Sequence, residues 1–195
     1  MILLTGATGT AGSFIANEFV RERVPVRILV RNRAKAAGLE KVATVEIVEG
    51  DMSKRSTLGP ALDGVDRVLM ISAPVMDMVE TQNTFIDAAK AAGVRHVIKF
   101  SGLDARRDTT FPFGLMLNDG AFYLALDDVM LNPVDLVDVG KVAFLLLRDG
   151  GHEGEQIPVT GQEARPWRKW LIASHARREG RCATSPYLLT RAARR

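Results

Sequence analysis

The sequence of 195 residues is poor in cysteine and in aromatic residues: it has one cysteine, and Phe, Trp and Tyr together make up 6%. A single cysteine excludes an internal disulfide and favours a reducing compartment. No apolar run reaches the roughly 18 residues that a membrane-spanning helix needs, and no basic segment precedes the first apolar residues as in a signal peptide. Since 47% of the residues are hydrophobic and 25% are charged, disorder of the whole chain is excluded. We therefore expect a soluble, cytoplasmic protein with one folded domain.

Acidic residues are almost absent from the C-terminal segment. The net charge is +3, but nine of the 26 Lys and Arg residues and only one acidic residue, Glu179, lie after residue 164. The basicity therefore belongs to this segment and does not indicate that the whole protein binds nucleic acid. Trp167 and Trp170 could stack on bases, but the segment has no recognisable nucleic-acid motif, and we expect no specific nucleic-acid partner. We predict a folded domain at residues 1–164 and a basic tail at residues 165–195.

Short apolar runs alternate with helical patterns over the first 100 residues. The runs predict strands at Met1–Thr5, Val26–Val30, Thr44–Val48, Arg67–Ile71 and Arg95–Phe100, and the patterns between them predict helices at Gly12–Arg23, Ser56–Leu62 and Thr81–Ala92. We expect Pro25 to end the first helix and Gly93 to close the third. Continuous Val, Ile and Leu runs separated by helices predict a doubly wound α/β fold with a parallel sheet.

The pattern is weaker after residue 104. Phe122–Leu131 fits either a helix or a strand, and Pro133–Leu136 reads as a short extended segment. A helix is predicted at Val139–Arg148 with Asp138 as its N-cap. Gln156–Val159 is a further strand candidate, limited to a sheet edge or strand end by its proline.

A glycine-rich turn follows the first predicted strand directly. Gly6, Gly9 and Gly12 are spaced by two residues each and open the first helix. Glycines in this context allow a tight turn, a close approach of the backbone to a pyrophosphate and close packing of helix on strand. The N–H groups at the helix start carry the favourable dipole sign for phosphate. The turn predicts a dinucleotide-binding site; the alternative is a glycine-rich turn without a ligand.

The residues after the second strand indicate which dinucleotide binds. An NAD site needs an acidic residue here to accept hydrogen bonds from the ribose 2′-hydroxyl, but the sequence has Arg31, Arg33 and Lys35 and no acid. A guanidinium can bind a 2′-phosphate through two hydrogen bonds. NADP(H) is therefore preferred over NAD(H), with Arg31 as the first candidate. The alternative is a solvated basic loop, above all for Arg33 and Lys35.

Several segments together resemble a known family. The stretches TGATGTAG, VRILVRNRAKAAGL, EGDM and AAKAAGVRHVIKFSGL are similar to the NmrA-like branch of the atypical short-chain dehydrogenases/reductases, and the resemblance covers residues 1–114 and 124–164. It implies an NAD(P)-binding Rossmann fold. It also implies an NADPH-dependent reductase of quinones or azo compounds, or a non-catalytic NADP(H) sensor, since the branch contains both.

The resemblance also implies site residues, carried over by position. It places Gly6, Thr8, Gly9, Thr10 and Gly12 at the pyrophosphate, Arg31 at the 2′-phosphate, Asp51 and Met52 beside the adenine, and Ser72, Ala73 and Pro74 near the nicotinamide ribose. These positions agree with the rule that ligands bind at the carboxyl ends of the strands in open α/β sheets.

The sequence departs from the family pattern at two places. Phe113 and Gly114 run almost directly into the later segment LNPVDLVDVG, so a helix, a strand and a substrate-lining loop of the family are expected to be missing. After Ala164 the family's helical pattern gives way to an Arg-rich sequence, for which we consider a shifted reading frame as a hypothesis.

The residues do not identify a catalytic group. Neither Tyr123 nor Tyr187 has a lysine four residues later, as the usual proton-transfer pair would require. Lys99 and Ser101 are polar candidates at the end of the fifth strand, with an exposed strand end and a capping hydroxyl as alternatives.

Other residue types give no stronger candidates. The three histidines are scattered and Cys182 stands alone, so no metal site is expected. Met70, Met76 and Met78 either line an apolar pocket or belong to the core.

Three functions stay open on this basis. The first is hydride transfer from NADPH to a quinone or a similar flat acceptor, and the second is NADP(H) binding without turnover. The third is a shortened, inactive relative. The glycine turn is compatible with all three, and fold alone does not decide between them.

Overall fold

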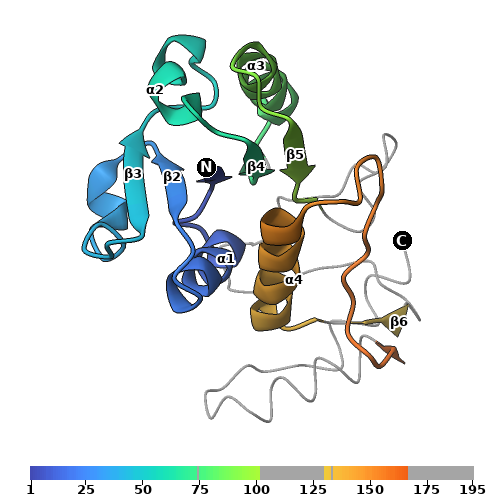
Figure 1. Cartoon of the computed structure of the whole chain (residues 1–195). Helices are drawn as coiled ribbons and strands as arrows, with labels where there is room; N and C mark the ends of the chain where they lie inside the picture. Colours follow the sequence, from blue (N-terminus) through green and yellow to red (C-terminus); the bar gives the residue numbers. More distant parts are fainter. Residues whose placement is uncertain (74, 102–129, 133, 167–195) are drawn as a thin grey trace, which may run out of the picture. The chain divides into compact units, whose positions relative to one another are not determined.

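The computed structural model describes residues 1–73, 75–101, 130–132 and 134–166 (Figure 1). The chain divides into two compact units, one of residues 1–109 and 135–159 and one of residues 110–134 and 160–195. The first unit contains the sheet and the helices discussed below. In the second, β6 (Met130–Leu131) pairs antiparallel with β7 (Arg165–Pro166).

The first unit is built on a five-stranded parallel sheet. Its strands are β1 (Ile2–Thr5), β2 (Val26–Val30), β3 (Val45–Glu49), β4 (Arg67–Met70) and β5 (His96–Lys99), in the order β3-β2-β1-β4-β5. All four pairings are parallel. Because the strand order reverses direction between β1 and β4, the crevice for a ligand in this fold lies at the carboxyl ends of those two strands.

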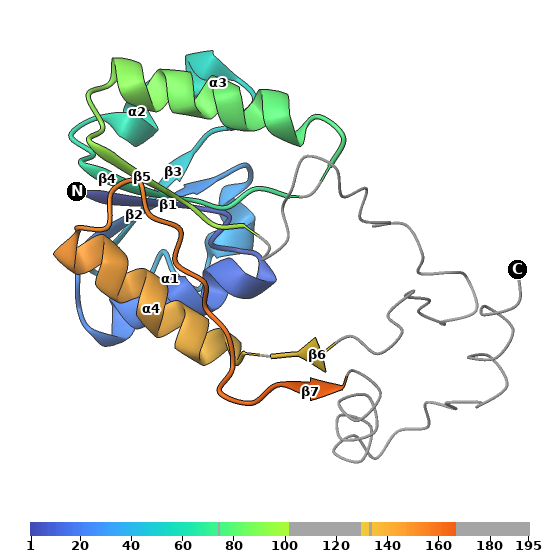
Figure 2. The same cartoon turned by 90° about the vertical axis from the view of Figure 1, so that its right-hand side faces the viewer.

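Helices cover both faces of the sheet. They are α1 (Thr10–Arg21), α2 (Gly59–Leu62), α3 (Met78–Ala91) and α4 (Leu136–Asp149), with 3₁₀ turns η1 (Arg33–Ala36) and η2 (Arg55–Thr57). Figure 2 shows α1 and α4 on one face and α2 and α3 on the other. The predicted doubly wound α/β fold is therefore confirmed.

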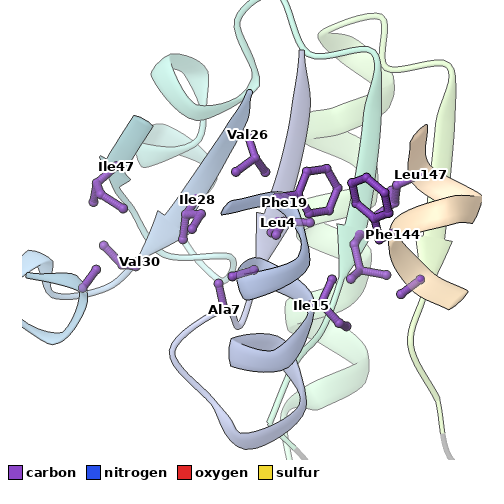
Figure 3. Packing of buried hydrophobic residues seen from close by; sticks show 14 residues of the cluster. Leu4, Ala7, Ile15, Phe19, Val26, Ile28, Val30, Ile47, Phe144 and Leu147 are labelled. Carbon is purple, nitrogen blue, oxygen red and sulfur yellow. The ribbon is translucent and has the colours of Figure 1, made fainter. Parts of the chain in front are cut away.

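Successive strand residues serve opposite faces of the sheet. The buried hydrophobic residues form two clusters, one between the sheet and helices α1 and α4 and the other between the sheet and helices α2 and α3. On β1, Leu4 belongs to the cluster of α1 and α4, and its neighbour Leu3 belongs to the cluster of α2 and α3. Phe19 of α1 and Phe144 of α4 meet edge to face, with ring centroids 4.9 Å apart (Figure 3), a favoured aromatic geometry. A segment late in the chain thus completes the core that the first thirty residues begin.

The end of α1 differs from the prediction. The helix ends at Arg21, and Pro25 lies beyond it at the start of β2. Arg23 takes a left-handed conformation (φ 55°), and the amides of Arg23 and Val24 donate to the carbonyls of Val20 and Phe19. This is a Schellman motif, which closes a helix without proline.

At the end of α3 the prediction is confirmed. Gly93 (φ 80°) donates to Lys90, and Val94 donates to Ala89, in the same Schellman geometry. The left-handed residue is a glycine here, which carries no Cβ to clash.

The start of α4 is also corrected. Asp135, not Asp138, is the N-cap, and its carboxylate accepts a hydrogen bond of 2.8 Å from the Val137 amide. Asp138 lies inside the first turn, where the helix dipole favours an acid. Leu136 is therefore helical rather than extended.

Two further expectations concern short segments. Residues 156–159 form no strand, and of the ambiguous segment 122–131 only Met130–Leu131 is described, as β6. No helix within the described ranges is long and apolar enough to cross a membrane.

Arg67 attaches α4 to the sheet, and we expect its loss to destabilise the unit. Its Nη1 donates to the carbonyls of Leu147 and Arg148, at 2.7 and 2.8 Å, in the last turn of the helix where carbonyls lack intrahelical partners. Hydrogen bonds from a charged group are each worth more than neutral ones, so Arg67→Met should lower the free energy of unfolding by about 1.5–3 kcal/mol.

The matched control is Arg95→Met, measured in the same urea titration. Arg95 pairs with Asp66 beside Arg67, but its side chain is 78% exposed, and exposed ion pairs contribute about 0–1 kcal/mol. Equal losses for both variants would contradict the role of Arg67 at the helix end.

Candidate functional site

The glycine turn lies between the ends of β1 and β4. Gly6 follows β1 with φ 64°, and its carbonyl accepts a hydrogen bond of 2.9 Å from the Gly9 amide. A Cβ on Gly6 would lie 2.9 Å from both the Cβ and the carbonyl oxygen of Ile71. Glycine is therefore required here by the backbone conformation and by the contact with the residue that follows β4.

Gly12 brings α1 close to the turn. A Cβ there would lie 2.2 Å from the Gly6 carbonyl oxygen and 2.8 Å from the Cα of Ala7. A Cβ on Gly9 would approach the same oxygen to 3.2 Å. The predicted tight turn and close helix packing are thus present, at the point where the sheet order reverses.

The first turn of α1 presents backbone donors with no side chain to satisfy them. The N-cap is Gly9, which provides no capping oxygen, and the first turn holds no acidic residue. The first N–H groups of a helix have no intrahelical partner, and the helix dipole makes this end positive. Thr8 and Thr10 are exposed on either side of Gly9. This cradle of glycines and amide donors fits a pyrophosphate.

Two arginines follow β2, and they differ in their partners. The Nε of Arg33 lies 2.6 Å from the Glu40 carboxylate, so its charge is already paired. The exposed Arg31 makes no hydrogen bond or ion pair with any other described residue. Of the two, Arg31 is the guanidinium available to a phosphate, and Glu40 is a residue whose role the sequence pattern did not reveal.

Asp51 lies next to this basic loop, after β3. Its Oδ1 accepts hydrogen bonds from the Ser53 amide (3.0 Å) and the Ser53 hydroxyl (2.8 Å). These bonds, chiefly the one from the amide, lower the pKa of the carboxyl, and the charges of Lys54 and Arg31 lower it further. Its neighbour Met52 is half-buried and packs against the cluster of α2 and α3.

The lowered pKa of Asp51 predicts a pH effect on stability. Because the folded state holds this proton less tightly than the unfolded state, the stabilisation is complete above the unfolded value of about 3.9 and is lost as the pH falls through the folded value. Below about pH 4, the wild type should lose unfolding free energy faster than Asp51→Asn. Urea titrations of both proteins between neutral and acid pH test this, and parallel pH curves would contradict it.

The end of β4 is held to the end of β1 by side-chain hydrogen bonds. The Thr5 hydroxyl donates to the Ile71 carbonyl and accepts from the Ile71 amide, both at 2.8 Å. The next residue, Ser72, accepts a 2.7 Å hydrogen bond from Nε2 of Gln82 on α3. Ser72 therefore lies at the reversal point beside the glycine turn, with exposed Ala73 after it.

The remaining candidates do not converge on this site. Met70 is buried in the core, as its alternative interpretation predicted, whereas Met76 is fully exposed, so the methionines line no common pocket. Lys99 and Ser101 are exposed at the end of β5. Pro74, Tyr123, Trp167, Trp170, His175, Cys182 and Tyr187 lie outside the described residues. Within the described ranges, no group of three or more His, Cys, Asp or Glu residues could hold a metal.

A hollow of about 290 Å³ lies at the other end of the strands, around the starts of β4 and β5. It is lined by Asp66, Arg67, Arg95, His96 and Glu153. Its arginines already bind Asp66 and the carbonyls of α4. Since ligands in this fold bind at the carboxyl ends of the strands, this hollow is not the nucleotide site.

Comparison with known proteins identifies the family. The sequence model of the NmrA-like family matches residues 1–113, more than half of the chain. The chain belongs to the NmrA-like family. The resemblance of the glycine turn and of the later strand segments to this family is thereby confirmed.

Several reductases are similar to this chain in sequence or structure. An NAD(P)H azoreductase of Xenophilus azovorans is 31% identical, over 84% of this chain and 69% of its own length. The structure of an NADPH-dependent quinone oxidoreductase from Escherichia coli with NADPH has a TM-score of 0.74 at 26% identity, covering 90% of this chain and 76% of the other. A triphenylmethane reductase of Citrobacter sp. with NADP(H), 22% identical, has a TM-score of 0.73 over 90% of this chain and 75% of its own, which supports the fold.

Proposed function

We propose that this NmrA-like protein binds NADP(H) at the glycine turn and transfers hydride from NADPH to a small-molecule acceptor. The observation that carries the proposal is the cradle of Gly6, Gly9 and Gly12 at the reversal point of the sheet, with uncapped amide donors at the start of α1. The similarity to an azoreductase and to an NADPH-bound quinone oxidoreductase supports the same function.

The position of Arg31 favours NADP(H) over NAD(H). Its guanidinium makes no hydrogen bond or ion pair with another described residue, and its charge lowers the pKa of Asp51, which follows the third strand. No acidic residue occupies the loop of residues 31–35 that would bind a ribose 2′-hydroxyl. A phosphate at that position would therefore meet the Arg31 guanidinium, and the loop itself carries no carboxylate to repel it.

The acceptor we propose is a quinone or a similar flat, apolar molecule. Exposed apolar side chains follow Ser72 and continue into α3: Val75 is 55% exposed, Val79 65%, and Met76 fully. Such side chains at the rim of the site suit an apolar ring. NADPH would supply the hydride and solvent water the proton that together reduce a quinone, and residues of the described site would bind and orient the nucleotide.

The second candidate is binding of NADP(H) without turnover. The alignment with the azoreductase is 198 positions long, but only 84% of the 195 residues of this chain take part in it. Many aligned positions therefore hold a residue of the azoreductase opposite a gap in this chain, which lacks some tens of residues that the relative has. Because the family match ends at residue 113, we place the missing segment there. Loss of elements that cover the nicotinamide would weaken catalysis more than nucleotide binding.

Thermal unfolding with each nucleotide tests the proposal. NADPH at 100 times its dissociation constant should stabilise the protein by about 2.7 kcal/mol, a rise in Tm of roughly 5–10 °C for this size. NADH at the same concentration should raise the Tm less. A Tm that neither nucleotide moves would overturn the binding site.

An assay of NADPH oxidation with 1,4-benzoquinone then separates the two candidates. Oxidation above the protein-free rate supports the reductase. Binding without oxidation supports the non-catalytic alternative.

A further inference from the structure

Gln82 is a buried polar side chain whose amide hydrogen bond leads to the site. It lies on α3 with 8% of its surface exposed, on the same helix face as Phe85 and Ala89. Burying an amide away from water is unfavourable unless it is hydrogen-bonded. The partner of Gln82 is the Ser72 hydroxyl, 2.7 Å away and ten residues earlier in the chain.

Ser72 lies at the reversal point of the sheet, beside the glycine turn where we propose that the nucleotide binds. It follows Ile71, which contacts Gly6 across the crevice and is bonded through both backbone groups to the Thr5 side chain. These bonds fix the backbone on either side of the crevice between β1 and β4. The hydroxyl of Ser72 is the first side-chain polar group beyond that fixed junction on the β4 side.

The direction of the hydrogen bond decides what Ser72 can do. Because Nε2 of Gln82 donates, the Ser72 oxygen accepts, and the hydroxyl proton stays available for another acceptor. The bond also selects one rotamer of a side chain that otherwise rotates freely. Gln82 thus leaves Ser72 as an oriented donor, to which a ribose or carboxamide oxygen of a bound nucleotide would be a suitable acceptor.

We propose that Gln82 is a positioning residue that holds the Ser72 hydroxyl as a hydrogen-bond donor to the bound NADP(H). This inference rests on the proposed nucleotide binding and names a residue that acts through another. Gln82 itself is buried and donates from Nε2 to Ser72, so it would act on the nucleotide only through that hydroxyl.

A double-mutant cycle on nucleotide affinity tests the inference. The proteins are the wild type, Gln82→Met, Ser72→Ala and the double variant, and the readout is the NADPH dissociation constant from fluorescence titration. Each single change should weaken binding about 3- to 10-fold, the range of one neutral hydrogen bond. The double variant should be no weaker than Ser72→Ala alone, because Gln82 acts only through that hydroxyl.

A conservative variant adds a readout that a purely structural role would not move. In Gln82→Glu the ionised carboxylate can only accept, so it would turn the Ser72 proton away from the ligand. Protonation restores a donor, and burial raises the pKa of such a carboxyl. The affinity of Gln82→Glu for NADP⁺ should therefore approach the wild-type value as the pH falls. Asn83→Ala, at the exposed neighbouring position, is the control and should bind as the wild type does at every pH.

The outcomes separate this inference from the proposed function. If the wild type binds NADPH and the two single losses of affinity multiply in the double variant, the role of Gln82 is overturned, and the proposed nucleotide site is not. An affinity of Gln82→Glu for NADP⁺ that does not change with pH would also overturn the role of Gln82. A wild type that does not bind NADPH overturns the nucleotide site, and the inference with it.

Discussion

Replacing Gly12 by alanine is expected to weaken NADPH binding by about 100-fold, equivalent to about 2.7 kcal/mol. The added Cβ would lie 2.2 Å from the Gly6 carbonyl oxygen and 2.7 Å from its carbon. Both are backbone atoms of a tight turn, so no side chain can rotate to make room. α1 must therefore move away from the turn, and its amide donors move away from the phosphates with it.

The same collision should destabilise the folded protein by about 1–3 kcal/mol, the usual effect of overpacking. Gly59→Ala is the matched control, because an added Cβ there meets no atom within 4 Å. Isothermal titration with NADPH and urea unfolding of both variants provide the two measurements. Binding by Gly12→Ala at the wild-type affinity would show that the nucleotide does not lie on this turn.

The strands were predictable because helices cover both faces of the sheet and its central strands β1, β2 and β4 are mostly buried. Parallel strands covered by helices read as nearly continuous apolar runs, so the ends of these runs lie close to the strand boundaries even where a charged residue such as Arg27 interrupts them. Val26–Val30 matches β2 at both ends, and Arg67–Ile71 exceeds β4 by one residue. The glycine turn could also be predicted, because three glycines at this spacing between a strand and a helix are typical of a nucleotide-binding turn.

Helix ends were less predictable because several neighbouring residues were suitable as caps. Asp135 and Asp138 are both good N-cap types, and only the backbone path makes the first of them the cap. At the end of α1, Arg23 adopts a left-handed conformation that a glycine would suit better, so the composition gave no signal there. The more conspicuous Pro25 pointed to the wrong residue.

The pairings that shape the site lie beyond any local pattern. Glu40 pairs with Arg33 from seven residues away, and Gln82 reaches Ser72 from the next helix. One signal was present for Gln82: it falls on the apolar face of its helix, three residues before Phe85. A polar residue in such a position must find a partner, but the sequence alone does not say which.

The contrast between Arg31 and Arg33 leads to the second large effect. Arg31→Glu should weaken NADPH binding by about 100-fold, because it removes charge-assisted hydrogen bonds to the 2′-phosphate and puts a like charge in their place. NADH has no such phosphate, so its affinity should change by less than about 3-fold. Separate titrations of the variant with the two nucleotides measure this ratio.

Arg33→Glu is the control that makes the result specific, because it changes the charge of the same loop by the same amount. Arg33 already pairs with Glu40 at 2.6 Å, so its field at the phosphate is partly neutralised and NADPH affinity should fall much less than in Arg31→Glu. Equal losses in the two variants would mean that the loop attracts phosphate through its overall charge. Equal losses of NADPH and NADH in Arg31→Glu would instead remove Arg31 from the 2′-phosphate site. We therefore expect a preference for NADP(H) to depend on Arg31, which makes no hydrogen bond or ion pair with another described residue, and not on the number of arginines in the loop.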